Sequence, residues 1–163
     1  MKLSSLKDLF IHELQDLYNA ENQLVKALPK MMEAVSDKKL KDSIQNHIKE
    51  TETQIQRLEE CAKILDIKIT GEKCKAMEGL LKEASSFLEE DATPEVMDAG
   101  IIACCQRVEH YEIAGYGTAC TYAKSLGEKE VLKLLKETLA EEKKTDELLT
   151  KIAESTVNKK ADA

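Results

Sequence analysis

The amino-acid sequence predicts an all-α protein, and more narrowly a bundle of four long helices. Three observations lead to this prediction. Charged residues make up 34% of the 163 residues and aromatic residues only 4%, a composition typical of a helical globular protein. Apolar residues recur at intervals of three and four along four long segments. The helix-interrupting residues Pro and Gly occur only two and six times.

The first two long helices are predicted from about Ser4 to Val35 and from about Lys38 to Asp66. Pro29 is expected to kink the first helix or to mark a local break, because its ring removes a backbone hydrogen bond. Ser36 and Asp37 offer an N-cap for the second helix. The apolar stripe of the first helix consists of Leu6, Phe10, Leu14, Leu17, Leu24, Leu28, Met31 and Val35.

The second half of the chain begins with a short helix, predicted over Lys75 to Glu89. Thr93 as N-cap and Pro94 in the first turn then open the third long helix, which runs to about Leu126. Gly127 ends it. The fourth helix is predicted over Glu128 to Thr156, and the polar segment 158–163 is expected to fray.

The lengths of the connections predict the topology. Few residues join the first helix to the second or the third to the fourth, so each pair should form an antiparallel hairpin. Nearly 30 residues separate the two pairs, enough to travel the length of a helix and start again at the other end. This is ferritin-like connectivity, a four-helix bundle with one long crossover that contains a short extra helix. We expect a single domain over residues 1–163.

Charge and cysteine content exclude several classes of protein. The formal net charge is −7, and Lys and Glu are evenly interspersed, which argues against a nucleic-acid or anionic-membrane surface. No segment resembles a signal peptide or a membrane span, so we expect a cytoplasmic protein. An odd number of cysteines without CxxC spacing favours buried, reduced thiols. The five are Cys61, Cys74, Cys104, Cys105 and Cys120.

Glutamates interrupt the apolar stripes near the midpoints of three long helices. Glu21 lies between Leu17 and Leu24 in the first helix, and Glu142 has a similar place in the fourth. Glu109 and Glu112 lie on consecutive turns of one side of the third helix. Because antiparallel helices of similar length place their midpoints at one level, we expect these carboxylates to converge inside the bundle.

The second helix fits this arrangement less closely. Its midpoint residue Glu50 projects roughly 90° from the centre of the apolar stripe, whereas His47 and Gln54 lie closer to that centre. We include Glu50 because we expect the short crossover helix to cover the side of Ile44 and to turn Glu50 toward the bundle.

Buried carboxylates need positive charge beside them. Several in one place would repel one another and would each lose several kcal/mol of hydration free energy. Protonation, pairing with Lys or Arg, or a pair of metal ions could compensate them. The three stripes contain no Lys or Arg at the level of the glutamates. Metal ions would neutralise all of them together, and an oxygen-rich ligand set suits iron or manganese better than zinc.

Several segments resemble the YciF-type ferritin-like stress proteins of bacteria over nearly the whole chain. They read LYNAENQL, HIKETETQ, AMEGLLKEA, VEHYEIAGYGT and LLKETLAEEKKTDELL. That group is related in fold to the rubrerythrins and other dinuclear carboxylate proteins. The resemblance implies a dinuclear iron or manganese site and, in related proteins of this kind, a homodimer. The ligands that it implies are Glu21, Glu50, Glu109, Glu112 and Glu142.

The sequence departs from the usual ferritin-like pattern in one respect. Such sites place a His three residues after the Glu of the second and fourth helices, and these positions are Thr53 and Thr145. Other nearby side chains could replace the missing histidines as ligands. The candidates are Gln54 and Asp146, each four residues after its Glu, His47, one turn before Glu50, and His110, beside Glu109.

Three functions stay open at this stage. A dinuclear centre can oxidise ferrous iron, reduce or dismutate peroxide, or activate dioxygen, and the resemblance to stress proteins favours peroxide or iron oxidation chemistry. The chain lacks a module with paired CxxC motifs that could supply electrons. Metal storage without turnover and a non-catalytic helical interaction module are the alternatives.

Four residues near the expected site have structural predictions of their own. Glu141 is expected on the outer side of the fourth helix, and Tyr116 in the core with its hydroxyl hydrogen-bonded nearby. Gly115 and Gly117 indicate close approach of a neighbouring helix, either of this chain or of a second subunit.

Overall fold

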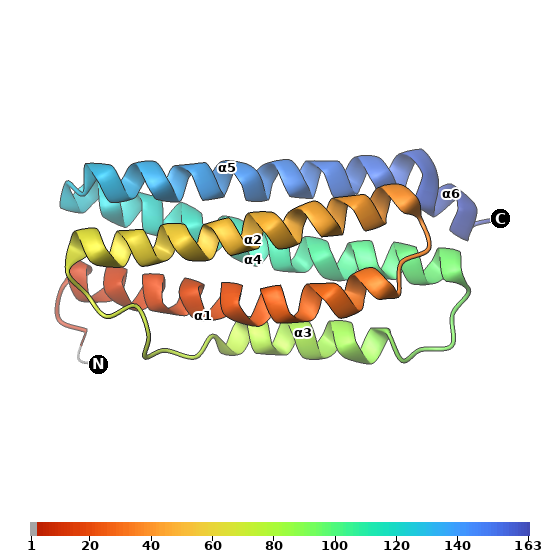
Figure 1. The fold of residues 1–163 in the computed structure, drawn as a ribbon, viewed down its shortest axis with the longest axis horizontal. Helices are drawn as coiled ribbons and strands as arrows, with labels where there is room; N and C mark the ends of the chain where they lie inside the picture. Colours follow the sequence, from red (N-terminus) through yellow and green to blue (C-terminus); the bar gives the residue numbers. More distant parts are fainter. Residues whose placement is uncertain (1–2) are drawn as a thin grey trace.

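Four long helices run back and forth along one axis in the computed structural model, which describes residues 3–163. The long helices are α1 (Leu6–Glu33), α2 (Lys38–Leu65), α4 (Pro94–Leu126) and α5 (Lys129–Ile152). The short helix α3 (Lys75–Phe87) lies in the crossover (Figure 1). The two hairpins and the single long crossover confirm the ferritin-like connectivity.

The helices pack in the cyclic order α1, α2, α5, α4. The crossover returns the chain along the outside of this bundle, with α3 beside α1 in Figure 1. Its packing partners are α1 and α4, so the expectation that α3 covers the side of α2 that carries Ile44 is wrong. The argument that brought Glu50 into the interior therefore fails.

Local signals in the sequence set most helix ends. The Asp37 side chain accepts hydrogen bonds from two backbone N–H groups of the first turn of α2. Thr93 caps α4 ahead of Pro94, and Gly127 ends it in the left-handed conformation at φ 77°. Pro29 does not break α1, which continues to Glu33.

The C-terminal segment is helical rather than frayed. A π-helical turn (Ala153–Val157) and the short helix α6 (Asn158–Ala161) follow α5. The prediction of a frayed end is wrong because Val157 is buried in the core and the Lys160 Nζ atom lies 2.9 Å from the Asp37 carboxylate. No helix within residues 3–163 is both long and apolar enough to span a membrane.

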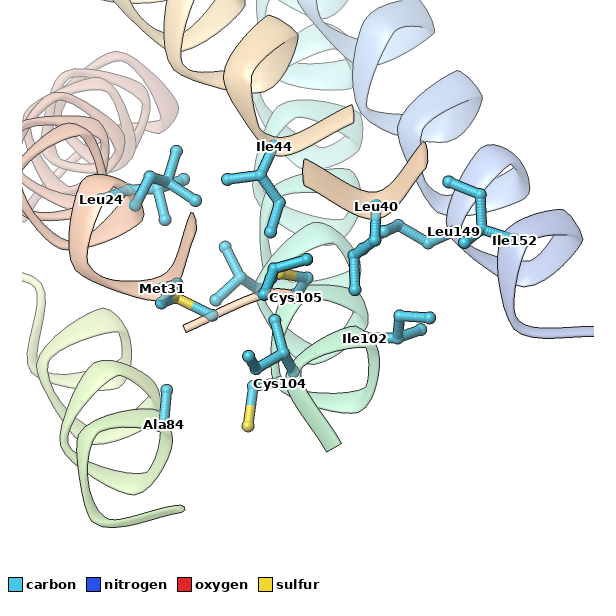
Figure 2. Close-up of a cluster of buried hydrophobic side chains, with 14 of the residues drawn as sticks. Leu24, Met31, Leu40, Ile44, Ala84, Ile102, Cys104, Cys105, Leu149 and Ile152 are labelled. Atoms are coloured by element: carbon cyan, nitrogen blue, oxygen red, sulfur yellow. The ribbon is translucent and has the colours of Figure 1, made fainter. Parts of the chain in front are cut away.

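The apolar core consists of two clusters. One includes Leu24, Ile44, Cys105 and Leu149 (Figure 2), and the other surrounds Phe10 at the opposite end of the bundle. All five cysteines are free and buried, as the sequence predicts. Between the clusters the inward positions of the helices are polar. The apolar core thus stops at the level where the glutamates were expected to meet.

Candidate metal centre

The polar layer between the two apolar clusters is formed by side chains from all four long helices. Each helix runs from one apolar cluster to the other, so an inward residue at its midpoint has to lie in this layer. The most buried members are at most 4% exposed. They are Glu21 on α1, His47, Thr51 and Gln54 on α2, Glu109 and Glu112 on α4, and Thr138 and Glu142 on α5.

Four of these side chains bring their polar atoms to one point. His47, Glu109, Glu112 and Glu142 each offer one ligand atom, and these four atoms lie within 4.8 Å of one another. The His47 Nε2 atom lies 3.1 Å from Glu109 Oε1. The four residues come from three helices, α2, α4 and α5, that are separate in sequence and meet only through packing.

Glu21 extends the cluster toward α1. Its carboxyl group and that of Glu112 are close enough to share a hydrogen bond when one of them is protonated. Tyr116 donates a hydrogen bond from its hydroxyl to Glu21 Oε1 at 2.5 Å, so this tyrosine has the buried, hydrogen-bonded role that the sequence predicts. The second carboxylate oxygen of Glu21 remains without a hydrogen-bond partner.

Burial raises the free energy of the charged forms of the ionisable side chains at this site. It raises the pKa of Glu21 to about 8, an effect that the negative field of Glu142 strengthens and the Tyr116 hydrogen bond opposes. Burial, and then neighbouring carboxylates, raise the pKa values of Glu109 and Glu112 well above their usual range. Burial also lowers the pKa of His47, which favours the neutral imidazole. Without a cation, the folded protein therefore holds extra protons here.

Buried polar atoms without hydrogen-bond partners are concentrated in this cluster. Of the ten buried side-chain N and O atoms without a hydrogen-bond partner in residues 3–163, eight belong to this cluster. They are Glu21 Oε2, both ring nitrogens of His47, Gln54 Oε1, Glu109 Oε2, both oxygens of Glu112 and Glu142 Oε2; the His47 Nε2 atom is close to Glu109 Oε1 but not aligned for a hydrogen bond. Buried polar groups normally have partners. This set, rich in oxygen with one imidazole, fits iron or manganese ions.

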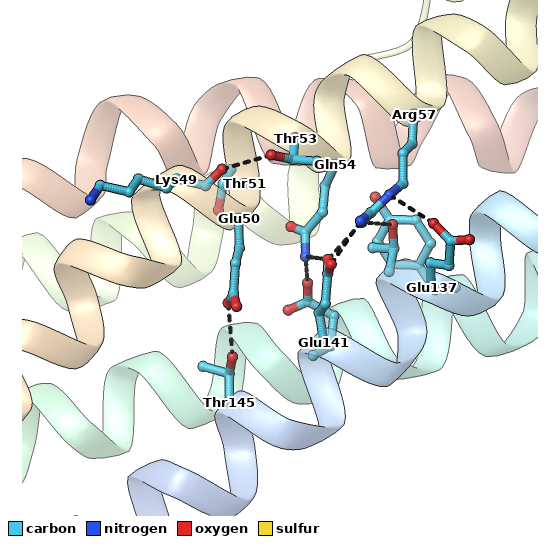
Figure 3. A network of polar contacts seen from close by, with 12 residues as sticks. Lys49, Glu50, Thr51, Thr53, Gln54, Arg57, Glu137, Glu141 and Thr145 are labelled. Carbon is cyan, nitrogen blue, oxygen red and sulfur yellow. Dashed lines mark hydrogen bonds and ion pairs between the residues drawn. The ribbon is translucent and has the colours of Figure 1, made fainter.

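A hydrogen-bonded network closes the cluster on the side where α2 faces α5 (Figure 3). The Gln54 amide donates to Glu142 Oε1 and, at 3.1 Å, to Glu141 Oε2. Arg57 donates to both oxygens of Glu141 at 2.6 and 2.7 Å. Glu142 is fully buried, as expected, whereas Glu141 is half-buried at the seam with α2 and not on the outer side of α5, because Arg57 and Gln54 engage its carboxylate there.

Two predicted ligands lie at the edge of the cluster: Glu142 acts electrostatically on Glu50, and Asp146 on Glu109, but neither belongs to the group of four. Glu50 is half-buried at the seam between α2 and α5, where its carboxylate accepts a hydrogen bond from Thr145 at 3.5 Å (Figure 3). Asp146 lies between α4 and α5 and contacts exposed His110 at 3.2 Å and Gln106 at 3.1 Å. The structure thus brings together Glu21, Glu109, Glu112, Glu142, His47 and Gln54, but not Glu50, Asp146 or His110.

Sequence reasoning missed Arg57. The residue lies one turn after Gln54, but an arginine beside an apolar stripe is usually on the surface, so the stripe pattern did not single it out. Only the packing of α2 on α5 shows that Arg57 reaches Glu141.

Comparisons with known proteins agree with the fold, and the similarity extends over nearly the whole chain. Residues 5–162 match the family model described as a domain of unknown function, DUF892. The protein YciF of Escherichia coli (strain K12) is 48% identical over 163 residues, which cover 99% of this chain and 98% of that protein.

Solved structures show the same arrangement. The crystal structure of the E. coli stress protein YciF matches with a TM-score of 0.92 and 47% identity, covering 96% of this chain and 99% of that one. The Rhodopseudomonas palustris protein YcfI, to which a structural role is ascribed, matches with a TM-score of 0.89 and 42% identity, covering 91% and 95%. The family model and the 48% identity to YciF together establish that the chain belongs to the DUF892 family.

Proposed function

We propose that this protein is a stress-response metalloprotein with a dinuclear iron or manganese site, acting in peroxide reduction or dismutation or in ferrous iron oxidation. The observation that carries the proposal is the buried cluster of four glutamates and one histidine, whose unpaired atoms have no cationic side chain among them. The similarity to the E. coli stress protein supports the physiological context.

The chain's own residues supply binding and exclusion of bulk water. Glu109, Glu112, Glu142 and His47 would hold the ions, and Glu21 would complete the set from α1. When bound, two adjacent redox-active ions can exchange two electrons with peroxide or dioxygen. The apolar clusters on both sides restrict water, and Tyr116 orients Glu21.

Two adjacent glutamates of α5 provide a matched test of metal binding. Wild-type protein loaded with Fe²⁺ or Mn²⁺ and then desalted is expected to retain two ions per chain by elemental analysis. Glu142→Gln should lose at least one ion, because it removes a buried carboxylate of the cluster. Glu141→Gln should retain both, because Glu141 faces Arg57. Wild-type protein without bound metal, or equal loss in both variants, would contradict the proposal.

A non-catalytic function is the second candidate, favoured by the structural role ascribed to the R. palustris relative. Peroxide consumption and ferrous oxidation, measured on metal-loaded wild type and on Glu142→Gln, separate the two. Turnover that is present in wild type and lost in Glu142→Gln supports the redox function. Retained metal without turnover of either substrate supports the non-catalytic one.

A further inference from the structure

The seam between α2 and α5 poses a question about ligand choice, because Glu141 and Glu142 are neighbours and either could reach the metal centre. The side chain of Glu141 is only 26% exposed, and its negative field contributes to the raised pKa of Glu21. It is therefore close enough to affect the cluster electrically. Something has to keep this carboxylate out of the ligand set.

Arg57 has the geometry to hold Glu141 away. Its Nη1 and Nη2 atoms donate to different oxygens of Glu141, so both carboxylate oxygens are engaged. The same guanidinium donates to Thr138 Oγ1 at 3.2 Å and lies 3.5 Å from Glu137. A two-pronged pair between Arg and a carboxylate is directional and strong. The guanidinium is thus held in place by three residues of α5.

Gln54 connects this ion pair to the buried cluster. Its amide nitrogen donates to one oxygen of Glu141 and to one oxygen of Glu142. The opposite orientation of the amide would place its oxygen against two carboxylates, so the surroundings select the donor orientation. With Oε1 of Glu142 engaged by Gln54, the unpartnered Oε2 is the atom left for an ion.

The balance of charges also favours a site in which Glu141 does not bind the ions. Glu21, Glu109, Glu112 and Glu142 carry four negative charges when ionised, and two divalent ions balance them while His47 is neutral. A further carboxylate from Glu141 would leave excess negative charge in a dry interior, which is costly. Paired with Arg57, Glu141 adds no net charge.

We propose that Arg57 and Gln54 are positioning residues of the metal centre: Arg57 withholds Glu141 from the ions, and Gln54 presents Glu142 to them. This inference rests on the proposed function, since it assumes that ions bind at the cluster. It assigns to Gln54 a different role from the ligand role that the sequence suggests.

Co²⁺ is a suitable probe, because its visible absorption depends on the number and kind of its ligands. We would compare Co²⁺-loaded wild type with Arg57→Met, which removes the charge but keeps an unbranched side chain. The control is Arg107→Met, which changes the exposed arginine of α4 near Glu83. Arg57→Met is expected to shift the visible band because Glu141 becomes free to bind, whereas Arg107→Met should leave the spectrum unchanged.

The double variant Arg57→Met/Glu141→Gln distinguishes positioning from a general structural role. It removes the competing carboxylate together with the arginine, so the wild-type spectrum should return. Circular dichroism of each variant checks that the helices form. An unshifted band in Arg57→Met, or a shifted band that the second substitution fails to restore, would overturn the inference. Absence of a Co²⁺ spectrum in wild type would instead contradict the proposed function.

Discussion

At the scale of single residues, the glutamates of the polar layer would have to lose protons if metal ions bind as proposed. Burial raises the pKa values of Glu21, Glu109 and Glu112 in the folded chain, while in the unfolded chain they are near 4.5. At pH values between the unfolded pKa and the raised folded pKa, the folded, metal-free protein thus binds more protons than the unfolded one. Such groups stabilise the fold below the unfolded pKa and lose this contribution as pH rises through the folded pKa.

We therefore expect the metal-free protein to become less stable from about pH 5 to pH 8, by about 1.4 kcal/mol per pH unit for each net proton released on unfolding. The lowered pKa of His47 opposes this trend below its unfolded value of 6.5 but is outnumbered by the three carboxyl groups. Urea denaturation in the presence of a chelator measures this slope. Glu112→Gln should flatten it, since the substituted amide does not titrate. A free energy of unfolding that stays constant or rises over this range would contradict the prediction.

Tyr116 gives a second prediction at this scale, because its hydroxyl orients Glu21. Tyr116→Phe keeps the ring in the core but removes the hydrogen bond. Loss of such a partner of a metal ligand typically weakens metal binding about 10- to 100-fold. Competition with a coloured chelator for Mn²⁺ measures the affinity. Tyr122→Phe, on the same helix, serves as the control, and equal affinities of the two variants would rule out the orienting role.

At the scale of helices, contacts of small residues decide how closely neighbours pack. A Cβ atom added at Gly100 of α4 would lie 1.9 Å from the ring of Phe87 of α3, and one at Gly115 would lie 2.8 Å from Leu17 of α1. A Cβ at Gly117 would meet no atom of the described chain within 4 Å. The prediction of close helix approach is thus correct for Gly115, whereas for Gly117 no neighbour lies within this chain and approach by a second subunit stays a prediction.

Gly100, the most crowded of these positions, and Gly117, the least crowded, form a matched pair on α4. Gly100→Ala should destabilise the fold by about 1–3 kcal/mol, because the new methyl group displaces the Phe87 ring. Gly117→Ala should stabilise it by about 0.5–1 kcal/mol, because it reduces the freedom of the unfolded chain without a clash. Urea denaturation of both variants measures the difference, and the reverse order would show that α3 does not pack on α4 as described.

At the scale of the whole molecule, the cluster couples the four long helices. Metal ions would bind the folded chain and not the unfolded one, so they should stabilise it by about 4 kcal/mol at a thousandfold excess over the dissociation constant. For a chain of this size we expect Tm to rise by about 10 °C. Calorimetry with Mn²⁺ and with a chelator tests this.

The pH dependence of the Tm increase tests whether metal binding to the carboxyl groups causes it. Because metal ions displace protons from carboxyl groups, the Tm increase should grow as pH rises, opposite to the trend of the metal-free protein. Glu142→Gln should show a much smaller increase at every pH. An unchanged Tm in wild type would mean that the cluster holds no ion. The expected homodimer stays a prediction at this scale.

The sequence by itself determined the helices and the level at which they become polar. Caps such as Asp37, Thr93 and Gly127 are local signals, and the midpoint positions of Glu21 and Glu142 follow from helical periodicity and matched helix lengths. Helix caps and helical periodicity both depend on residues close together in the sequence. The residue pattern is therefore enough to predict them.

Only the tertiary structure decided which polar side chains meet. Glu50 and Asp146 are each within one turn of a buried residue, yet their side chains lie at the seams between helices. Their placement is set by how α2, α4 and α5 pack against one another. The choice between Glu141 and Glu142 depends on Arg57 of another helix, a contact between residues 84 positions apart that no local pattern could reveal.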